Sequence, residues 1–239
     1  MKIYRDIVSK FPSELKTLID KYSYLSEDEF WKKVHDKWQD NPEVFSAPRA
    51  QLRANDILKI FKIIKTDIKF QSYLDIGCGS GAITNTVAKT LNIKEYHGLD
   101  ILRPFDKDQI NYLGDHLIYY DGKNFPKIKV DFVTCFQVLH HVPNLSSMID
   151  FINETDCKYL IIREHDVKTE EEKKKLDFEH FIYGKVFQEN VYEDFDKTYY
   201  SNYKSVREWI HLFKKFDCRL VLRKKYTIDK IVYIVFKRL

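Results

Sequence analysis

The chain has 239 residues, enough for one large domain or for one domain with an extension. Hydrophobic residues make up 44% of it and charged residues 32%, which allows a sizeable core, and no apolar run is long enough to span a membrane. The net charge of +4 is compatible with an acidic partner such as RNA, but it is too small to argue for one.

The cysteines and the first residues indicate the compartment. Four cysteines, Cys78, Cys135, Cys157 and Cys218, lie far apart with no CxxC spacing. Residues 1–6 lack the apolar block of a signal peptide. We therefore expect a reduced, cytoplasmic protein.

Residues 1–69 are expected to form a helical N-terminal cap. Proline and capping signals near residues 12, 26 and 48 mark the starts of three helices, and apolar residues follow each start at helical spacing. On the third helix Arg49 and Arg53 lie four residues apart and share one face. That face is either solvated, which is the commoner case, or it flanks a bound ligand, which makes Arg53 a candidate substrate residue.

From residue 70 the pattern alternates between strands and helices, which predicts an α/β fold with a doubly wound, mostly parallel sheet. Two further strands near the C-terminus form an antiparallel hairpin, so that the sheet has seven strands. Ligands of such sheets bind at the carboxyl ends of the strands. The predicted strands are 70–76, 95–99, 116–120, 130–136, 158–163, 219–222 and 230–236, and the predicted helices are 82–91, 106–113, 145–155 and 205–216.

Residues 167–204 form a charged, aromatic insertion in the domain expected over 70–239. It is too long for an ordinary loop, and aromatic residues mixed with lysines are able to stack on nucleobases, although an added helical layer is the commoner explanation. We predict that this insertion is a lid over the substrate, with His180 and Tyr183 as candidate substrate residues.

Three glycines at alternate positions, Gly77, Gly79 and Gly81, follow the first strand of this domain, and a helix begins directly after them. Glycine permits positive φ and a close approach of a ligand to the backbone. The helix N-terminus adds unpaired N–H groups and a partial positive charge. The stretch therefore predicts a binding site for a nucleotide-like ligand with a polar or anionic end.

The segment Asp75–Gly81 resembles the first motif of class I S-adenosylmethionine-dependent methyltransferases, an acid at the strand end followed by G-x-G-x-G. The resemblance extends over roughly residues 70–239 in the order and type of elements, and it implies the seven-stranded fold and S-adenosylmethionine as cofactor. Asp100 matches the acid of the second motif, which accepts both ribose hydroxyls. The cofactor contacts that the resemblance implies are Asp75, Gly77, Cys78, Gly79, Gly81, Asp100, Ile101, Asp121, Gly122 and Gln137.

The same glycines also fit a dinucleotide fingerprint, Gly77-x-Gly79-x-x-Ala82, with Asp100 as the ribose acid. A nicotinamide-dependent oxidoreductase is thus an alternative. Two features favour the methyltransferase: Asp75 places a carboxylate where a methionine ammonium group would bind, and the antiparallel hairpin has no place in the alternative. A non-catalytic scaffold that keeps the cofactor site is a further alternative.

Histidines follow the fourth and fifth strands, where an acceptor would bind. The segment after strand four ends in Leu-His-His, as in many methyltransferases of small molecules, lipids and RNA, and includes His140 and His141. We predict His165, or else His140, as a general base that Glu164 or Asp166 orients. The alternative for each histidine is packing against adenosine or capping a helix. The predicted substrate residues are His141, His180, Tyr183 and Arg53.

Absent motifs narrow the chemistry further. Asp/Asn-Pro-Pro-Tyr and Pro-Cys are missing after strand four, which argues against the common exocyclic-amine type and against covalent cytosine methylation. Neither HxxH nor HExxH spacing occurs, so we expect no metal site. Methyl transfer to an oxygen or nitrogen acceptor is therefore predicted, and RNA, including its cap, and a small molecule remain open as acceptors.

Overall fold

The structure is a computed structural model that describes residues 17, 21, 42–65, 69–101, 112–121, 123–187, 201–225 and 230–239. The two helices predicted before residue 42 and most of the helix predicted over 106–113 lie outside the described residues. The same holds for Gly122 and for the turn between the last two strands.

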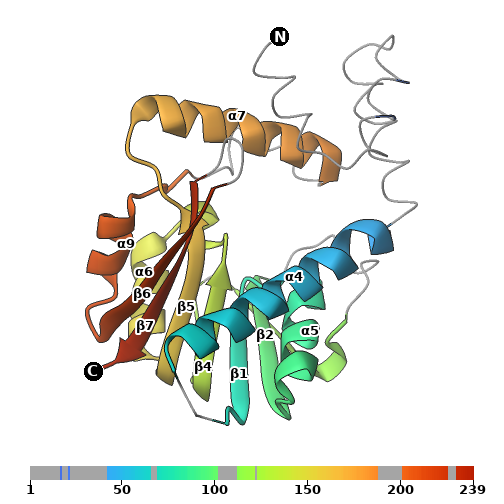
Figure 1. Ribbon diagram of the computed structural model, residues 1–239, viewed down its shortest axis with the longest axis vertical. Coiled ribbons are helices and arrows are strands. Elements are labelled where there is room, and N and C mark those ends of the chain that lie inside the picture. Colours follow the sequence, from blue (N-terminus) through green and yellow to red (C-terminus); the bar gives the residue numbers. More distant parts are fainter. Residues whose placement is uncertain are drawn as a thin grey trace.

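The described residues form a seven-stranded sheet of order β3-β2-β1-β4-β5-β7-β6 (Figure 1). Strands β1 to β5 pair in parallel, and β7 runs antiparallel to both β5 and β6. The predicted doubly wound sheet with its antiparallel C-terminal hairpin is therefore confirmed. The strands are β1 Ser72–Ile76, β2 Glu95–Ile101, β3 Leu117–Tyr120, β4 Lys129–Phe136, β5 Asp156–His165, β6 Phe216–Lys225 and β7 Lys230–Arg238.

Helices cover both faces of the sheet (Figure 1). One face packs against α4 and α5 and the other against α6 and α9, whereas α7 lies beyond the carboxyl end of β5. Among the described helices, none is both long and apolar enough to cross a membrane. The helices are α4 Pro42–Ile63, α5 Ala82–Leu91, α6 Leu145–Glu154, α7 Glu170–Phe187 and α9 Val206–Leu212, with short 3₁₀ turns η2 Gly114–His116 and η3 Leu139–His141.

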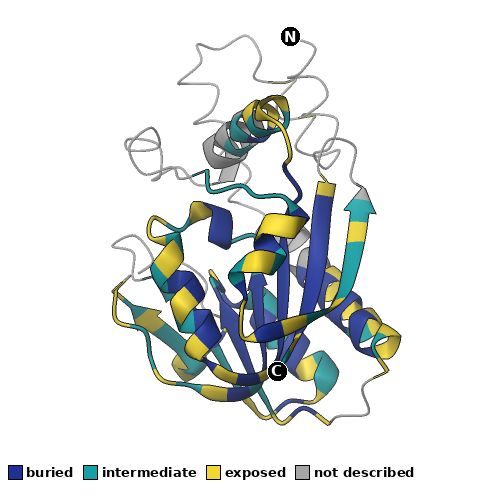
Figure 2. Ribbon diagram, turned by 90° about the vertical axis from the view of Figure 1, so that its left-hand side faces the viewer, coloured by how far each residue is buried: buried dark blue, intermediate teal, exposed yellow. Residues whose placement is uncertain are grey.

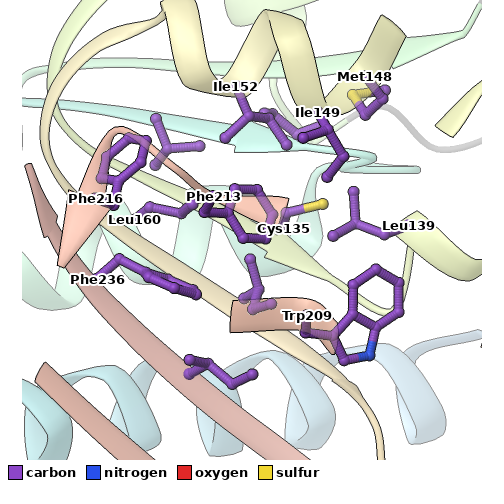
Figure 3. Packing of buried hydrophobic residues seen from close by; sticks show 14 of the residues in the cluster. Cys135, Leu139, Met148, Ile149, Ile152, Leu160, Trp209, Phe213, Phe216 and Phe236 are labelled. Atoms are coloured by element: carbon purple, nitrogen blue, oxygen red, sulfur yellow. The ribbon is translucent and has the colours of Figure 1, made fainter. Parts of the chain in front are cut away.

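The core forms two apolar layers because successive strand residues point to opposite faces. Tyr73 and Phe132 stack on the α4 and α5 side, with ring centroids 4.5 Å apart. Their neighbours Leu74 and Val133 belong to the layer under α6 and α9. Figure 2 shows the buried strands enclosed between the helices. Figure 3 shows the second layer, including Cys135, Leu139, Met148, Ile149, Ile152, Leu160, Trp209, Phe213, Phe216 and Phe236.

Two predicted helix boundaries are wrong. Helix α4 begins at Pro42, not at Pro48, because proline is well tolerated in a first helical turn, where its missing N–H group has no partner. Helix α9 ends at Leu212, because Phe213 leaves the helical conformation and Phe216 already pairs with β7. Strand β6 is correspondingly longer than the predicted 219–222.

A buried charged cluster fastens α4 to the sheet. The Asp56 carboxylate accepts a hydrogen bond of 2.6 Å from the Tyr233 hydroxyl and also pairs with Lys224. Arg53 is only 6% exposed and lies 3.6 Å from the same carboxylate. Its guanidinium also donates to the Tyr233 hydroxyl oxygen at 3.4 Å. Arg53 therefore belongs to the contact between α4 and β7, and its side chain is not solvated.

Replacing Tyr233 with phenylalanine is expected to lower the free energy of unfolding by about 1–2 kcal/mol, because the buried Asp56 carboxylate loses one hydrogen bond. Urea denaturation measures this as a lower midpoint with an unchanged slope. Tyr112, which is 36% exposed, offers a matched Tyr112→Phe control. Equal midpoints for the two variants would contradict this role of Asp56.

Candidate active site

The glycine loop between β1 and α5 depends on glycine at three positions. Gly77, Gly79 and Gly81 have φ angles of 71°, 55° and 78°, in the left-handed region. A Cβ atom on Gly77 would lie 2.1 Å from Val138 Cγ2, whereas one on Gly79 would meet nothing within 4 Å. The flanking part of the loop is thus tightly packed, and its middle faces open space where a ligand can approach the backbone.

Asp100, at the end of β2, lies directly against this loop. One of its carboxylate oxygens accepts a hydrogen bond of 2.5 Å from the Gly79 amide, and the other accepts from the Ile101 amide at 2.8 Å. The amides of Gly77 and Cys78 donate to the Leu99 carbonyl. The loop and the end of β2 therefore form one unit. The Cys78 thiol is buried within this unit, and burial raises its pKa well above the usual value.

Asp75 lies beneath the loop and is only 3% exposed. Its two carboxylate oxygens accept hydrogen bonds from the hydroxyls of Thr84 and Thr134, both at 2.6 Å. Burial raises the pKa of Asp75 to about 6 because it disfavours the charged form. Neither threonine was predicted as a site residue. Thr134 lies opposite Asp75 in the register of β1 and β4, which becomes visible only once that pairing is known.

Asp121 follows β3 and is fully exposed. Its carboxylate accepts hydrogen bonds from the backbone amides of Lys123 and Asn124 and from the Asn124 side chain. These donors lower the pKa of Asp121 to about 2. The residue therefore caps its own turn, and its predicted contact with adenine stays a prediction.

Glu164, near the end of β5, organises the Leu-His-His segment. One oxygen of its fully buried carboxylate accepts hydrogen bonds from the amides of Val138 and Leu139, at 3.0 and 2.8 Å. The other oxygen lies 2.5 Å from Nδ1 of His140. Burial raises the pKa of Glu164 to about 8 and holds that of His140 well below its usual value. The carboxylate thereby fixes the position of the His140 ring.

This pairing changes the predicted roles of the acidic residues. We predicted that Glu164 or Asp166 orients a general base, His165 or else His140, and the Glu164 carboxylate contacts His140, the second of these candidates. Asp166 accepts a hydrogen bond of 3.0 Å from the Val206 amide at the start of α9. Side chains alternate along a strand, so adjacent residues of β5 point to opposite faces, and this explains why Glu164 does not reach the ring next to it.

His165 and Gln137 meet at the carboxyl ends of β5 and β4. Nε2 of Gln137 lies 3.3 Å from Nε2 of His165, and Oε1 of Gln137 accepts a hydrogen bond from Arg163. The Gln137 backbone has a φ of 57°, and its amide donates to the Arg163 carbonyl at 2.7 Å. Gln137, predicted to contact the cofactor, therefore lies between the glycine loop and the histidines.

The predicted insertion also reaches this site. Nε2 of His180, on α7, lies 3.2 Å from Nε2 of His140. The Tyr203 hydroxyl lies 2.8 Å from Nδ1 of His180, and Tyr203 was not predicted. The exposed His141 ring lies 5.1 Å from the His180 ring. Tyr183 belongs to α7, but its side chain lies outside the described residues.

Comparisons with known proteins identify the family and the fold of the chain. A family model described as a methyltransferase domain matches residues 30–222. No curated protein sequence matches the chain. The structure is similar to magnesium protoporphyrin IX methyltransferase of Synechocystis with bound S-adenosylhomocysteine, at 15% identity over 91% of this chain and 98% of that one, with a TM-score of 0.53. The same enzyme is also known with bound S-adenosylmethionine, at 14% identity over 79% of both chains and a TM-score of 0.52.

A third similar structure is an O-methyltransferase family protein of Burkholderia thailandensis. The identity is 12% over 87% of this chain and 60% of that chain, with a TM-score of 0.55. At such identities the structures show a shared fold, and the family model, which spans most of the chain, shows the family. The chain therefore belongs to the methyltransferase domain family and has the class I, S-adenosylmethionine-dependent methyltransferase fold that its motifs predicted.

Proposed function

We propose that this chain binds S-adenosylmethionine at the glycine loop and transfers its methyl group to an oxygen or nitrogen of an acceptor held beside the histidines. The supporting observation is that both parts lie at one edge of the sheet. Val138 packs against Gly77 of the loop, and it is followed at once by the Leu-His-His segment that Glu164 organises. A ligand over Gly79 would thus have the histidines as neighbours.

The residues present fit the cofactor. The backbone is open at Gly79, and Asp100 beside it has carboxylate oxygens that are able to accept hydrogen bonds from ribose hydroxyls. When bound, S-adenosylmethionine supplies an electrophilic methyl group, and the protein contributes position and electrostatics. His140 and His165, with Glu164 behind His140, are the groups that would contact or orient the acceptor.

Replacing Asp100 with asparagine is expected to weaken S-adenosylmethionine binding by roughly 30- to 150-fold, because a charged hydrogen-bond acceptor for the ribose becomes neutral. Isothermal titration calorimetry measures the affinity. Glu95→Gln at the exposed amino end of the same strand is the matched control and should bind like the wild type. Unmeasurable binding by the wild-type chain would contradict the proposed cofactor site itself.

The acceptor class requires a separate assay. Transfer of a labelled methyl group from S-adenosylmethionine to total RNA, and in parallel to a metabolite extract, identifies the pool that contains the acceptor. Transfer to RNA would favour a nucleic-acid acceptor, cap-related or internal. Transfer to the metabolite extract would favour a small-molecule acceptor. Tight cofactor binding without transfer to either pool would favour a scaffold role over catalysis.

A further inference from the structure

Three histidines from separate parts of the chain converge beside the glycine loop. His140 comes from η3, His165 from the end of β5 and His180 from α7. Their ring centroids lie 5.0, 5.1 and 5.3 Å apart in the three pairs, and the rings are inclined to one another by 67° to 80°. Potential metal-binding atoms of the three side chains all lie within 4.8 Å of one another. The three ring centroids therefore form a nearly equilateral triangle, and the rings are not stacked on one another.

The surrounding groups select which ring nitrogens point inward. Glu164 lies on Nδ1 of His140, and the Leu176 carbonyl oxygen lies 2.9 Å from Nδ1 of His180. Nδ1 of each ring is engaged by an oxygen, and Nδ1 of His180 also has the Tyr203 hydroxyl at 2.8 Å, so Nε2 is the inward nitrogen in both rings. These two Nε2 atoms lie only 3.2 Å apart. Two nitrogens at that distance either share a hydrogen-bonded proton or bind one metal ion.

The third ring favours the metal ion over the proton. The Gln137 amide nitrogen approaches Nε2 of His165 at 3.3 Å, while its amide oxygen is held by Arg163. Gln137 therefore donates to Nε2 of His165, and a metal ion bound at that nitrogen would replace this hydrogen bond. A shared proton needs only two nitrogens, whereas three imidazoles with ligating atoms within 4.8 Å of one another form a common metal-ligand set.

The spacing fits a tetrahedral ion. With metal–nitrogen distances of about 2.0–2.1 Å, two ligating nitrogens lie about 3.4 Å apart and the centres of their rings about 5.2 Å apart. The observed nitrogen distance of 3.2 Å and the centroid distances of 5.0–5.3 Å are close to these values. Small side-chain rotations would bring the remaining nitrogens, now within 4.8 Å, to the same spacing.

We propose that His140, His165 and His180 bind one divalent first-row transition-metal ion of the zinc class, with a fourth position open to a ligand. Glu164 and the Leu176 carbonyl act as positioning groups behind the ligands, as carboxylates and carbonyls do in known metal sites. The sequence predicted no metal because the three ligands are 25 and 15 residues apart and belong to no short motif.

One consequence rests on the proposed function. Since the ion would lie at the carboxyl edge beside the glycine loop, its open position would hold the acceptor oxygen or nitrogen in reach of the methyl group. The metal site would therefore narrow the class of acceptor to molecules whose reacting oxygen or nitrogen is able to coordinate a metal ion. The site itself does not depend on methyl transfer, because it is formed by side chains of this chain alone.

The test is a titration of the full, metal-free chain with Co²⁺, whose visible absorption reports tetrahedral coordination by nitrogen, followed by displacement with Zn²⁺. We expect one ion per chain. His180→Ala, which changes a half-buried residue, should weaken binding at least 30-fold and alter the spectrum. The matched control is His211→Ala, at an exposed histidine of α9, which should leave both affinity and spectrum unchanged.

A second variant separates the positioning role of Glu164 from folding. Glutamine at this position is still able to accept from Val138 and Leu139, but its amide group would face Nδ1 of His140 and turn that ring's proton to Nε2. Glu164→Gln should therefore unfold at a similar temperature and bind Co²⁺ 10- to 100-fold more weakly. Absence of stoichiometric Co²⁺ or Zn²⁺ binding by the folded wild type, or equal losses in His180→Ala and His211→Ala, would overturn the proposal. Metal binding without S-adenosylmethionine binding would instead contradict only the proposed function.

Discussion

Replacing Gly77 with alanine is expected to lower the free energy of unfolding by roughly 3 kcal/mol and to abolish cofactor binding. A Cβ atom there would lie 2.1 and 2.7 Å from the two Cγ atoms of Val138 and 3.0 Å from its Cβ. Because Val138 is β-branched and stiff, its backbone would have to move. That movement would disturb the amide that donates to Glu164. The φ of 71° adds strain for any residue other than glycine.

Gly79→Ala is the matched comparison for this variant. Its Cβ atom would meet nothing within 4 Å, so only the strain of a φ of 55° remains, and the expected loss of stability is about 1 kcal/mol. The methyl group would nevertheless occupy the open space where we place the cofactor, and binding should be weakened. Urea denaturation and calorimetry on both variants test the two effects separately. Similar stability losses in both variants would show that Val138 does not restrict Gly77.

The unit of strand, glycine loop and helix was predictable because each part depends on local sequence. Glycine at Gly77, Gly79 and Gly81 permits a backbone that few other residues adopt, and the helix after them begins and ends as predicted, at Ala82 and Leu91. The position of Asp100 follows from the same logic, since it lies one residue before the end of β2, the next parallel strand. Local pattern and global fold agree throughout this part of the chain.

The acceptor side was only partly predictable, because its contacts join residues that are distant in sequence. The histidines were recognised as a group, but the partner of Glu164 depends on which face of β5 it occupies and on the path of the segment after β4. Likewise, Arg53 pairs with Asp56 on the same helix. It also contacts Tyr233 of β7, which lies 180 residues later in the sequence. Helical spacing identifies a shared face but not the element that covers it.

Replacing Asp75 with asparagine is expected to stabilise the fold at neutral pH while weakening cofactor binding. Burial raises the pKa of this carboxyl from the usual 3.8 to about 6. Below pH 4 both the folded and the unfolded chain carry the proton. Between pH 4 and 6 the unfolded chain releases it first, so wild-type stability falls as the pH rises, by roughly 3 kcal/mol at most. Asparagine does not ionise, and its amide is able to keep hydrogen bonds with both Thr84 and Thr134.

The stability difference between Asp75→Asn and the wild type should therefore grow from pH 4 to pH 6 and remain constant above. Urea denaturation at several pH values measures it, and Asp115→Asn, at an exposed aspartate of η2, is the matched control. A flat difference across this range would show that Asp75 does not hold its proton in the folded state. Cofactor affinity should move the other way, because the variant lacks the negative charge beneath the loop that we propose attracts the ammonium group of S-adenosylmethionine. Asp75 would then lower the stability of the fold and strengthen cofactor binding. We expect this combination in a site that has been selected for its ligand and not for stability.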